Sequence, residues 1–71
     1  MNLGPRIREL RQARGLTQQH LAAAIGTGPQ YLYQVESGFR QPSLSAIERL
    51  AEVLAVPIAE LFGSQPLTTN P

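Results

Sequence analysis

Apolar residues recur at helical spacing in five short segments of the chain, and no stretch alternates between apolar and polar residues as a strand would. Apolar residues three or four positions apart lie on one face of a helix, so this pattern predicts amphipathic helices with one buried side. Five helices without strands predict an all-α fold. The segments expected to be helical are 5–14, 18–25, 29–37, 44–54 and 57–62.

Residues suited to helix ends stand at the limits of these segments. Thr17 and Ser43 can cap the second and fourth helices with their hydroxyl oxygens. Pro29 suits the first turn of the third helix, where a missing amide hydrogen costs little. Gly26 and Gly38 suit the left-handed conformation that follows many helices. In the fourth helix, the expected apolar stripe consists of Leu44, Ile47, Leu50, Ala51 and Leu54.

The second and third helices are separated by a connection of only a few residues that begins at Gly26. Such a connection makes two short helices cross steeply, and the crossing needs a small residue where the backbones approach. Ala22, one turn before Gly26, supplies it. This spacing is that of a DNA-binding helix-turn-helix, in which the second helix of the pair enters the major groove.

Several motifs in register extend this likeness to most of the chain. They are Gly-Leu-Thr-Gln at 15–18, Glu-x-Gly at 36–38, Pro-Ser-Leu at 42–44 and Glu-Leu-Phe at 60–62. With these motifs the chain resembles the lambda-repressor-like family of helix-turn-helix domains, also called the Cro-type or xenobiotic-response-element family. The resemblance implies a compact five-helix fold and operator binding by a transcription regulator, most simply a repressor.

The resemblance also implies roles for single residues. Gln18 matches a glutamine that usually bonds a phosphate and can brace the recognition helix. Gln30 and Gln34 match positions that often contact base edges. Arg11 and Glu36 match a partly buried ion pair between the first and third helices, although they could also be two separate surface charges.

Helical periodicity independently places Gln30 and Gln34 on the exposed face of the third helix. If Leu32 and Val35 point inward, the opposite side is uncharged and forms hydrogen bonds. A glutamine there can donate to and accept from the N6/N7 edge of adenine, and phosphates are left to Gln18 and Arg40. On any other helix these side chains would be ordinary solvated residues. The residues expected to contact DNA are Gln18, Gln30, Tyr33, Gln34, Ser37 and Arg40.

The charge is unevenly distributed along the chain. The net charge is only +1, but residues 1–40 hold five arginines against two glutamates, and residues 41–71 hold one arginine against three glutamates. The first part is therefore basic, and every cation is an arginine, which suits recognition of phosphate. Arg6, Arg8 and Arg14 are expected to form a solvated face of the first helix, and the alternative for them is a direct phosphate contact.

Composition excludes several other classes of protein. The chain has no cysteine and one histidine, so we expect neither disulfides nor a metal or cofactor. No nucleophile and base can be assembled into a catalytic arrangement, so an enzyme is not expected. Because the chain lacks both a signal peptide and an apolar run of about 20 residues, a cytoplasmic protein is expected. Residues 1–63 are expected to form one domain, followed by a disordered tail at 64–71.

The chain departs from the family in two places. Gly28 and Pro29 replace a capping residue and a polar residue at the start of the third helix, and Phe39 replaces a polar or basic residue after it. An exposed phenylalanine there favours a protein contact or packing against its own loop. Because one small domain makes few phosphate and base contacts, we expect a homodimer on a palindromic operator with half-sites about 34 to 36 Å apart. The expected dimer surface consists of Phe39, Ile58, Leu61 and Phe62. The alternative is a protein-interaction module, such as an antitoxin, that uses this fold to bind a partner protein.

Overall fold

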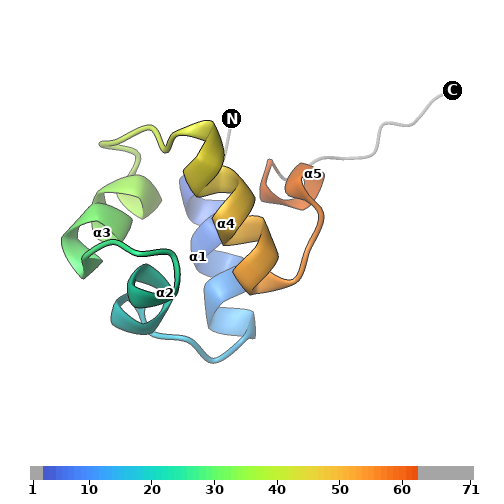
Figure 1. Cartoon of the computed structure of the whole chain (residues 1–71), viewed down its shortest axis with the longest axis horizontal. Coiled ribbons are helices and arrows are strands. Elements are labelled where there is room, and N and C mark those ends of the chain that lie inside the picture. Colours follow the sequence, from blue (N-terminus) through green and yellow to red (C-terminus); the bar gives the residue numbers. More distant parts are fainter. Residues whose placement is uncertain (1–2, 63–71) are drawn as a thin grey trace, which may run out of the picture.

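The computed structural model describes residues 3–62, which form five helices in the expected order (Figure 1). The predicted all-α fold is confirmed for this part of the chain. The predicted tail, 64–71, lies outside the described residues. The helices are α1 (Leu3–Ala13), α2 (Gln18–Ala24), α3 (Pro29–Ser37), α4 (Leu44–Leu54) and α5 (Ile58–Leu61).

The first and last helices differ from the predicted segments at their ends. Helix α1 begins at Leu3, two residues before Pro5, and Arg14 lies outside it. Proline is accepted in a first turn because the amides there have no acceptor within the helix. Helix α5 begins after Pro57, which acts as its N-cap, and Phe62 is its C-cap. Each proline therefore lies near the start of its helix, but neither is the first helical residue.

The predicted caps of the inner helices are confirmed. The hydroxyl oxygen of Thr17 accepts a hydrogen bond of 3.0 Å from the amide of His20, at the start of α2. Ser43 accepts one of 3.2 Å from the amide of Ala46, at the start of α4. Gly26 and Gly38 have φ values of 81° and 86°, so both adopt the left-handed conformation expected after a helix.

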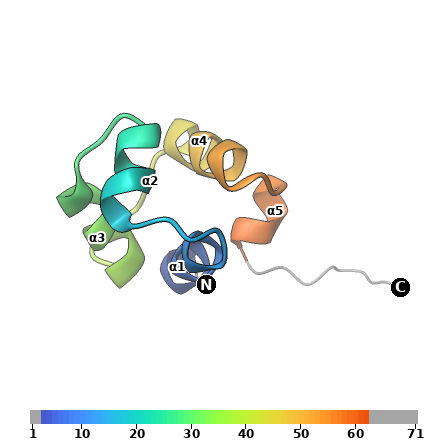
Figure 2. The same cartoon turned by 90° about the horizontal axis from the view of Figure 1, so that it is seen from below.

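The core lies between helices that are distant in sequence. Figure 2 shows α2 and α3 on one side of the domain and α5 on the other, with α1 and α4 between them. Leu44 is an exception to the predicted stripe on α4, because 68% of it is exposed. It is the first residue of α4, and the core begins at Ile47, one turn later. The largest fully buried side chains are Ile7, Leu21, Leu32, Leu50, Leu54, Leu61 and Val35.

Gly4 lies where α1 touches the backbone of α3, a contact that the sequence pattern did not predict. A Cβ at Gly4 would lie 2.5 Å from the carbonyl oxygen of Glu36 and 2.6 Å from that of Val35. Both atoms are backbone, so the two helices would have to separate. We expect Gly4→Ala to lower the free energy of unfolding by about 1 to 3 kcal/mol in urea denaturation. Gly28→Ala is the control, since nothing lies within 4 Å of its Cβ position and only the small cost of an alanine N-cap, at most about 1 kcal/mol, is expected. A loss there as large as that for Gly4→Ala would contradict the steric explanation.

Ala55 ends α4 in the left-handed conformation, with φ 60° and ψ 43°. This conformation is unfavourable for a residue with a Cβ and readily adopted by glycine. We expect Ala55→Gly to raise the free energy of unfolding by about 0.5 to 1 kcal/mol, measured by thermal denaturation. Ala23→Gly, at an exposed position inside α2, should instead lower it by about 1 kcal/mol. Equal destabilisation by both changes would show that Ala55 carries no strain.

Candidate nucleic-acid interface

Helices α2 and α3 form a tight pair around a buried small residue. Ala22 is fully buried, and its carbonyl oxygen accepts a hydrogen bond of 2.8 Å from the amide of Thr27 in the connection. Gly26 supplies the positive φ that reverses the chain. Helix α3 then starts at Pro29, and Gly28 before it offers no side-chain cap. The pair therefore has the predicted helix-turn-helix geometry.

Helix α3 has one buried face and one exposed face. Leu32 and Val35 are buried, as predicted. The opposite side carries no charge and presents amide, phenol and hydroxyl groups, which can donate and accept hydrogen bonds. Contact of these groups with DNA stays a prediction. On this face Gln30, Tyr33 and Ser37 are exposed, and Gln34 is half-buried.

Glu36 lies on the buried side of α3 and ties it to α1. Its side chain has no exposed surface. One carboxylate oxygen accepts from Nε of Arg11 at 2.7 Å, and the other accepts from Nη2 of the same guanidinium at 3.1 Å. Arg11 also donates to the carbonyl oxygen of Leu16 at 2.9 Å. The ion pair implied by the resemblance is therefore present, with bidentate geometry.

Gln18 extends this network to α2. Its Nε2 donates a hydrogen bond of 3.0 Å to Oε1 of Glu36, so Gln18 braces α3 as predicted. The amide nitrogen carries two hydrogens, and one remains for a phosphate, a contact that stays a prediction. Arg8 adds a weaker contact, with its Nε 3.6 Å from the same oxygen of Glu36. Helix α3 is thus fixed by both α1 and α2.

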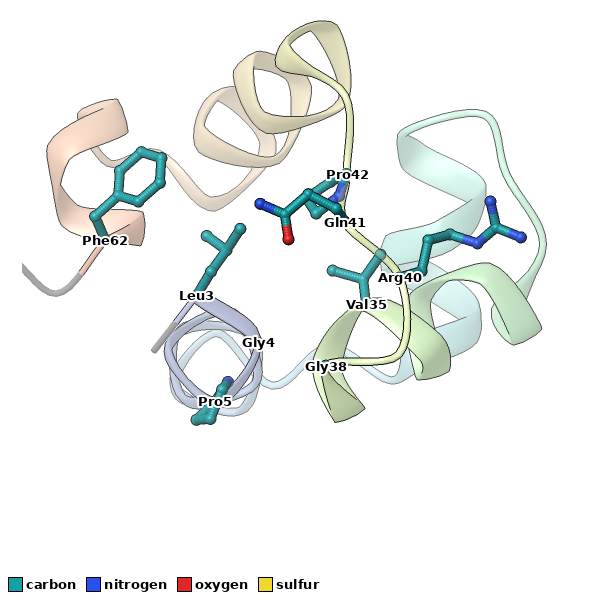
Figure 3. Close-up of a pocket in the computed structure, with 9 residues that line it drawn as sticks. All are labelled: Leu3, Gly4, Pro5, Val35, Gly38, Arg40, Gln41, Pro42 and Phe62. Carbon is teal, nitrogen blue, oxygen red and sulfur yellow. The ribbon is translucent and has the colours of Figure 1, made fainter. Parts of the chain in front are cut away.

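Arg40 folds back onto α3 from the α3–α4 connection. Its Nε donates to Oε1 of Gln34 at 3.0 Å, and its guanidinium lies over the ring of Tyr31, 5.4 Å from the centroid. Figure 3 shows the side chain pointing away from the hollow beside it and toward α2 and α3. We predicted from the sequence that Arg40 contacts DNA, but its bond to Gln34 was not predicted. Gln34 belongs to α3 and Arg40 to the connection after it, and the path of that connection does not follow from the sequence pattern.

Two arginines of the predicted solvated face also bind other helices, a role that the sequence pattern did not predict. Arg14 donates to the carbonyl oxygen of Leu54 at 2.7 Å, at the end of α4. Arg6 binds the carboxylates of Glu9 and Glu60, and these hydrogen bonds raise the pKa of its guanidinium. Among the described residues, much of the positive charge of the first half is therefore used inside the domain.

The structure also corrects the predicted dimer surface. Leu61 is fully buried and belongs to the core. Phe39 is 80% exposed in the α3–α4 connection, whereas Ile58 and Phe62 are 39% and 37% exposed on α5. Figure 1 shows the connection and α5 on opposite sides of α4. Because Leu61 is buried, the four residues do not form one surface, and the exposed apolar residues at α5 are Ile58 and Phe62.

A hollow of about 250 Å³ lies next to Phe62. Figure 3 shows Leu3 and Phe62 on one side of it and the chain from Gly38 to Pro42 on the other. Its lining is mixed, because Leu3, Val35, Pro42 and Phe62 are joined by the polar side chain of Gln41. Phe62, at the exposed side of α5, therefore also lines this hollow.

Residues 3–62 contain neither a cluster of metal-binding side chains nor a membrane-spanning helix. Within this range no three histidine, cysteine or acidic side chains gather where they could hold a metal ion. None of the helices in this range is long and apolar enough to cross a membrane. The chemistry that the exposed face of α3 offers is hydrogen bonding by neutral groups.

Comparison with known proteins connects this geometry to a family. The family model described as helix-turn-helix matches residues 7–61. Among curated proteins, the chain is 43% identical over 56 residues to the cryptic phage CTXphi transcriptional repressor RstR of Vibrio cholerae, covering 79% of this chain and 50% of RstR. It is 40% identical over 58 residues to the uncharacterized HTH-type transcriptional regulator YazB of Bacillus subtilis, covering 82% and 84%. The chain spans about half the length of the first of these relatives.

Two solved structures resemble the domain closely. The restriction-modification controller protein C.AhdI of Aeromonas hydrophila superposes with a TM-score of 0.82 at 44% identity, covering 86% of this chain and 92% of C.AhdI. The biofilm regulator SinR, solved in complex with DNA, superposes with a TM-score of 0.79 at 30% identity, covering 84% and 97%.

Proposed function

Because the chain belongs to the helix-turn-helix family, we propose that it is a sequence-specific DNA-binding transcription regulator, most simply a repressor, that inserts α3 into the major groove. The observation that carries this proposal is the neutral, hydrogen-bonding face of α3 on a helix fixed from behind by the Glu36 network. A rigid helix can present base-reading groups without an ordering cost at binding. The proposed activity is binding, with no catalytic step.

The named relatives favour this function over the alternative. RstR is a transcriptional repressor by name, and SinR was solved in complex with DNA. The protein-interaction alternative gains no support from these names. Titration of the DNA upstream of the gene at two salt concentrations tests the proposal, because phosphate contacts make DNA binding weaken with salt. Absence of binding at low salt would contradict it and favour a protein partner.

The exposed groups divide into two proposed roles. Gln30, Tyr33 and Gln34 face outward along α3 and contact base edges, which carry the sequence information. Gln18, Ser37 and Arg40 lie around them and contact phosphates, which position the helix in the groove. The bond from Arg40 to Gln34 uses Nε, so the terminal nitrogens of its guanidinium are left to donate to a phosphate.

Gln30→Ala tests the base-reading role. We expect it to lower affinity for the operator about 10- to 100-fold, the loss of one good base contact, with little change on random DNA. Fluorescence anisotropy with both DNAs measures the two affinities. Gln12→Ala removes an exposed glutamine from α1 and should leave both affinities unchanged. Equal loss on operator and random DNA for Gln30→Ala would assign Gln30 to the phosphates instead.

We further propose that the regulator acts as a homodimer through Ile58 and Phe62 of α5. One domain of this size makes few base contacts, and two copies on a palindrome double them. Partly exposed apolar side chains beside a recess suit contact with a second copy. This assignment retains two of the four residues expected from the sequence.

A further inference from the structure

We propose that Arg40 sets the base preference of Gln34 and makes it a reader of guanine instead of adenine. This inference rests on the proposed function, since it requires α3 in the major groove. It concerns the specificity of the site, for which Arg40 acts as a positioning residue through Gln34. Its basis is the bond of 3.0 Å from Nε of Arg40 to Oε1 of Gln34.

The chemistry of the pair fixes the orientation of the amide. A guanidinium has only donors, so the atom of Gln34 that faces it must be the carbonyl oxygen. The amide nitrogen then lies on the other side of the group, away from the Nε of Arg40. A glutamine without this neighbour could turn its amide over and present either atom to a base.

Three other contacts hold Arg40 in this position. The backbone amides of Phe39 and Arg40 both donate to the carbonyl oxygen of Gln34, at 2.9 and 3.2 Å. The guanidinium also lies over the ring of Tyr31, where a cation is attracted to the face of the aromatic system. The partners in these contacts, Tyr31 and Gln34, lie one turn apart on α3. The α3–α4 connection is therefore already held in place where Arg40 binds Gln34.

This arrangement suits guanine and opposes adenine. Adenine presents an N6 donor beside its N7 acceptor, whereas guanine presents two acceptors, O6 and N7. The second lone pair of Oε1 is still available, but a donor that approached it would lie beside the cationic guanidinium. The pair of Gln34 and Arg40 therefore presents donors and positive charge, which attract O6 of guanine and repel N6–H of adenine.

The test measures base preference at one base pair. An operator is selected from random DNA, and the pair read by Gln34 is identified as the one at which Gln34→Ala abolishes discrimination. Affinities for the guanine and adenine versions are then compared for the wild type and for Arg40→Met, which keeps an apolar stem over Tyr31 and removes the donors. We expect the wild type to prefer guanine about tenfold and Arg40→Met to lose or reverse this preference.

The ratio of the affinities for the guanine and adenine operators distinguishes this role of Arg40 from a simple phosphate contact. A lost phosphate contact weakens binding to both versions equally and leaves their ratio unchanged. An adenine preference in the wild type, or an unchanged guanine preference in Arg40→Met, would overturn the inference and leave the proposed function intact. Failure of the wild type to bind any DNA would overturn both. Preference at the pair read by Gln30 should stay the same in Arg40→Met.

Discussion

Arg11→Ala is expected to remove most of the protein's free energy of unfolding at room temperature. The substitution leaves the carboxylate of Glu36 fully buried with only the 3.6 Å contact of Arg8 in place of its bidentate partner, and breaking a buried pair in this way costs about 3 to 5 kcal/mol. A domain of this size buries a limited core and has a stability near the lower end of about 5 to 15 kcal/mol. Far-UV circular dichroism and urea denaturation measure the loss directly.

Two variants show whether the buried charge is the cause. Arg8→Ala removes a half-exposed guanidinium whose Nε is 3.6 Å from Glu36, and it should cost at most about 1 kcal/mol. Combining Arg11→Met with Glu36→Leu removes both charges and fills the space with apolar groups, which should restore much of the stability. Equal losses for Arg11→Ala and Arg8→Ala, or a double variant as unstable as Arg11→Ala, would contradict the explanation.

The helices themselves were predictable from the sequence because their signals are local. Apolar spacing identified all five, and the capping hydroxyls of Thr17 and Ser43 act on amides three residues away. The positive φ of Gly26 and Gly38 was also predictable, because it depends only on the helix that ends just before each glycine. Such features need no knowledge of how the helices pack.

Features that depend on packing were missed or assigned wrongly. Gly4 looked unremarkable because its role requires the backbone of α3 beside it. Leu61 and Ile58 are both apolar residues of α5, and only the position of α5 against the core decides that Leu61 is buried and Ile58 exposed. The bond between Arg40 and Gln34 likewise requires the path of the connection after α3.

Charge counts gave a similarly incomplete picture of the site. The first 40 residues are basic in sequence, but Arg6 and Arg14 bind groups of α5 and of the end of α4. Arg11 is occupied by Glu36. The basic half therefore contributes mostly to folding, and the proposed recognition relies on neutral groups with Arg40 beside them.

Ile58→Asp is expected to convert the proposed dimer into a monomer and to weaken binding to a palindromic operator about 100-fold or more. The change puts a carboxylate into an apolar contact, where its desolvation is unfavourable. A second half-site bound by a linked copy raises overall affinity by about 10² to 10⁴, and a monomer loses this gain. Ile58 is the first residue of α5, where a negative charge suits the helix dipole, so the fold should be retained.

Leu44→Asp provides a matched control for this experiment. Leu44 is also an exposed apolar residue at the first position of a helix, and its substitution should leave the oligomeric state unchanged. Analytical ultracentrifugation at micromolar concentration reports the mass, and gel-shift titration compares a whole palindrome with an isolated half-site. Ile58→Asp should bind the half-site as the wild type does, because α3 is untouched. A wild type that stays monomeric with and without DNA would refute the dimer, and a dimeric Ile58→Asp would move the interface away from α5.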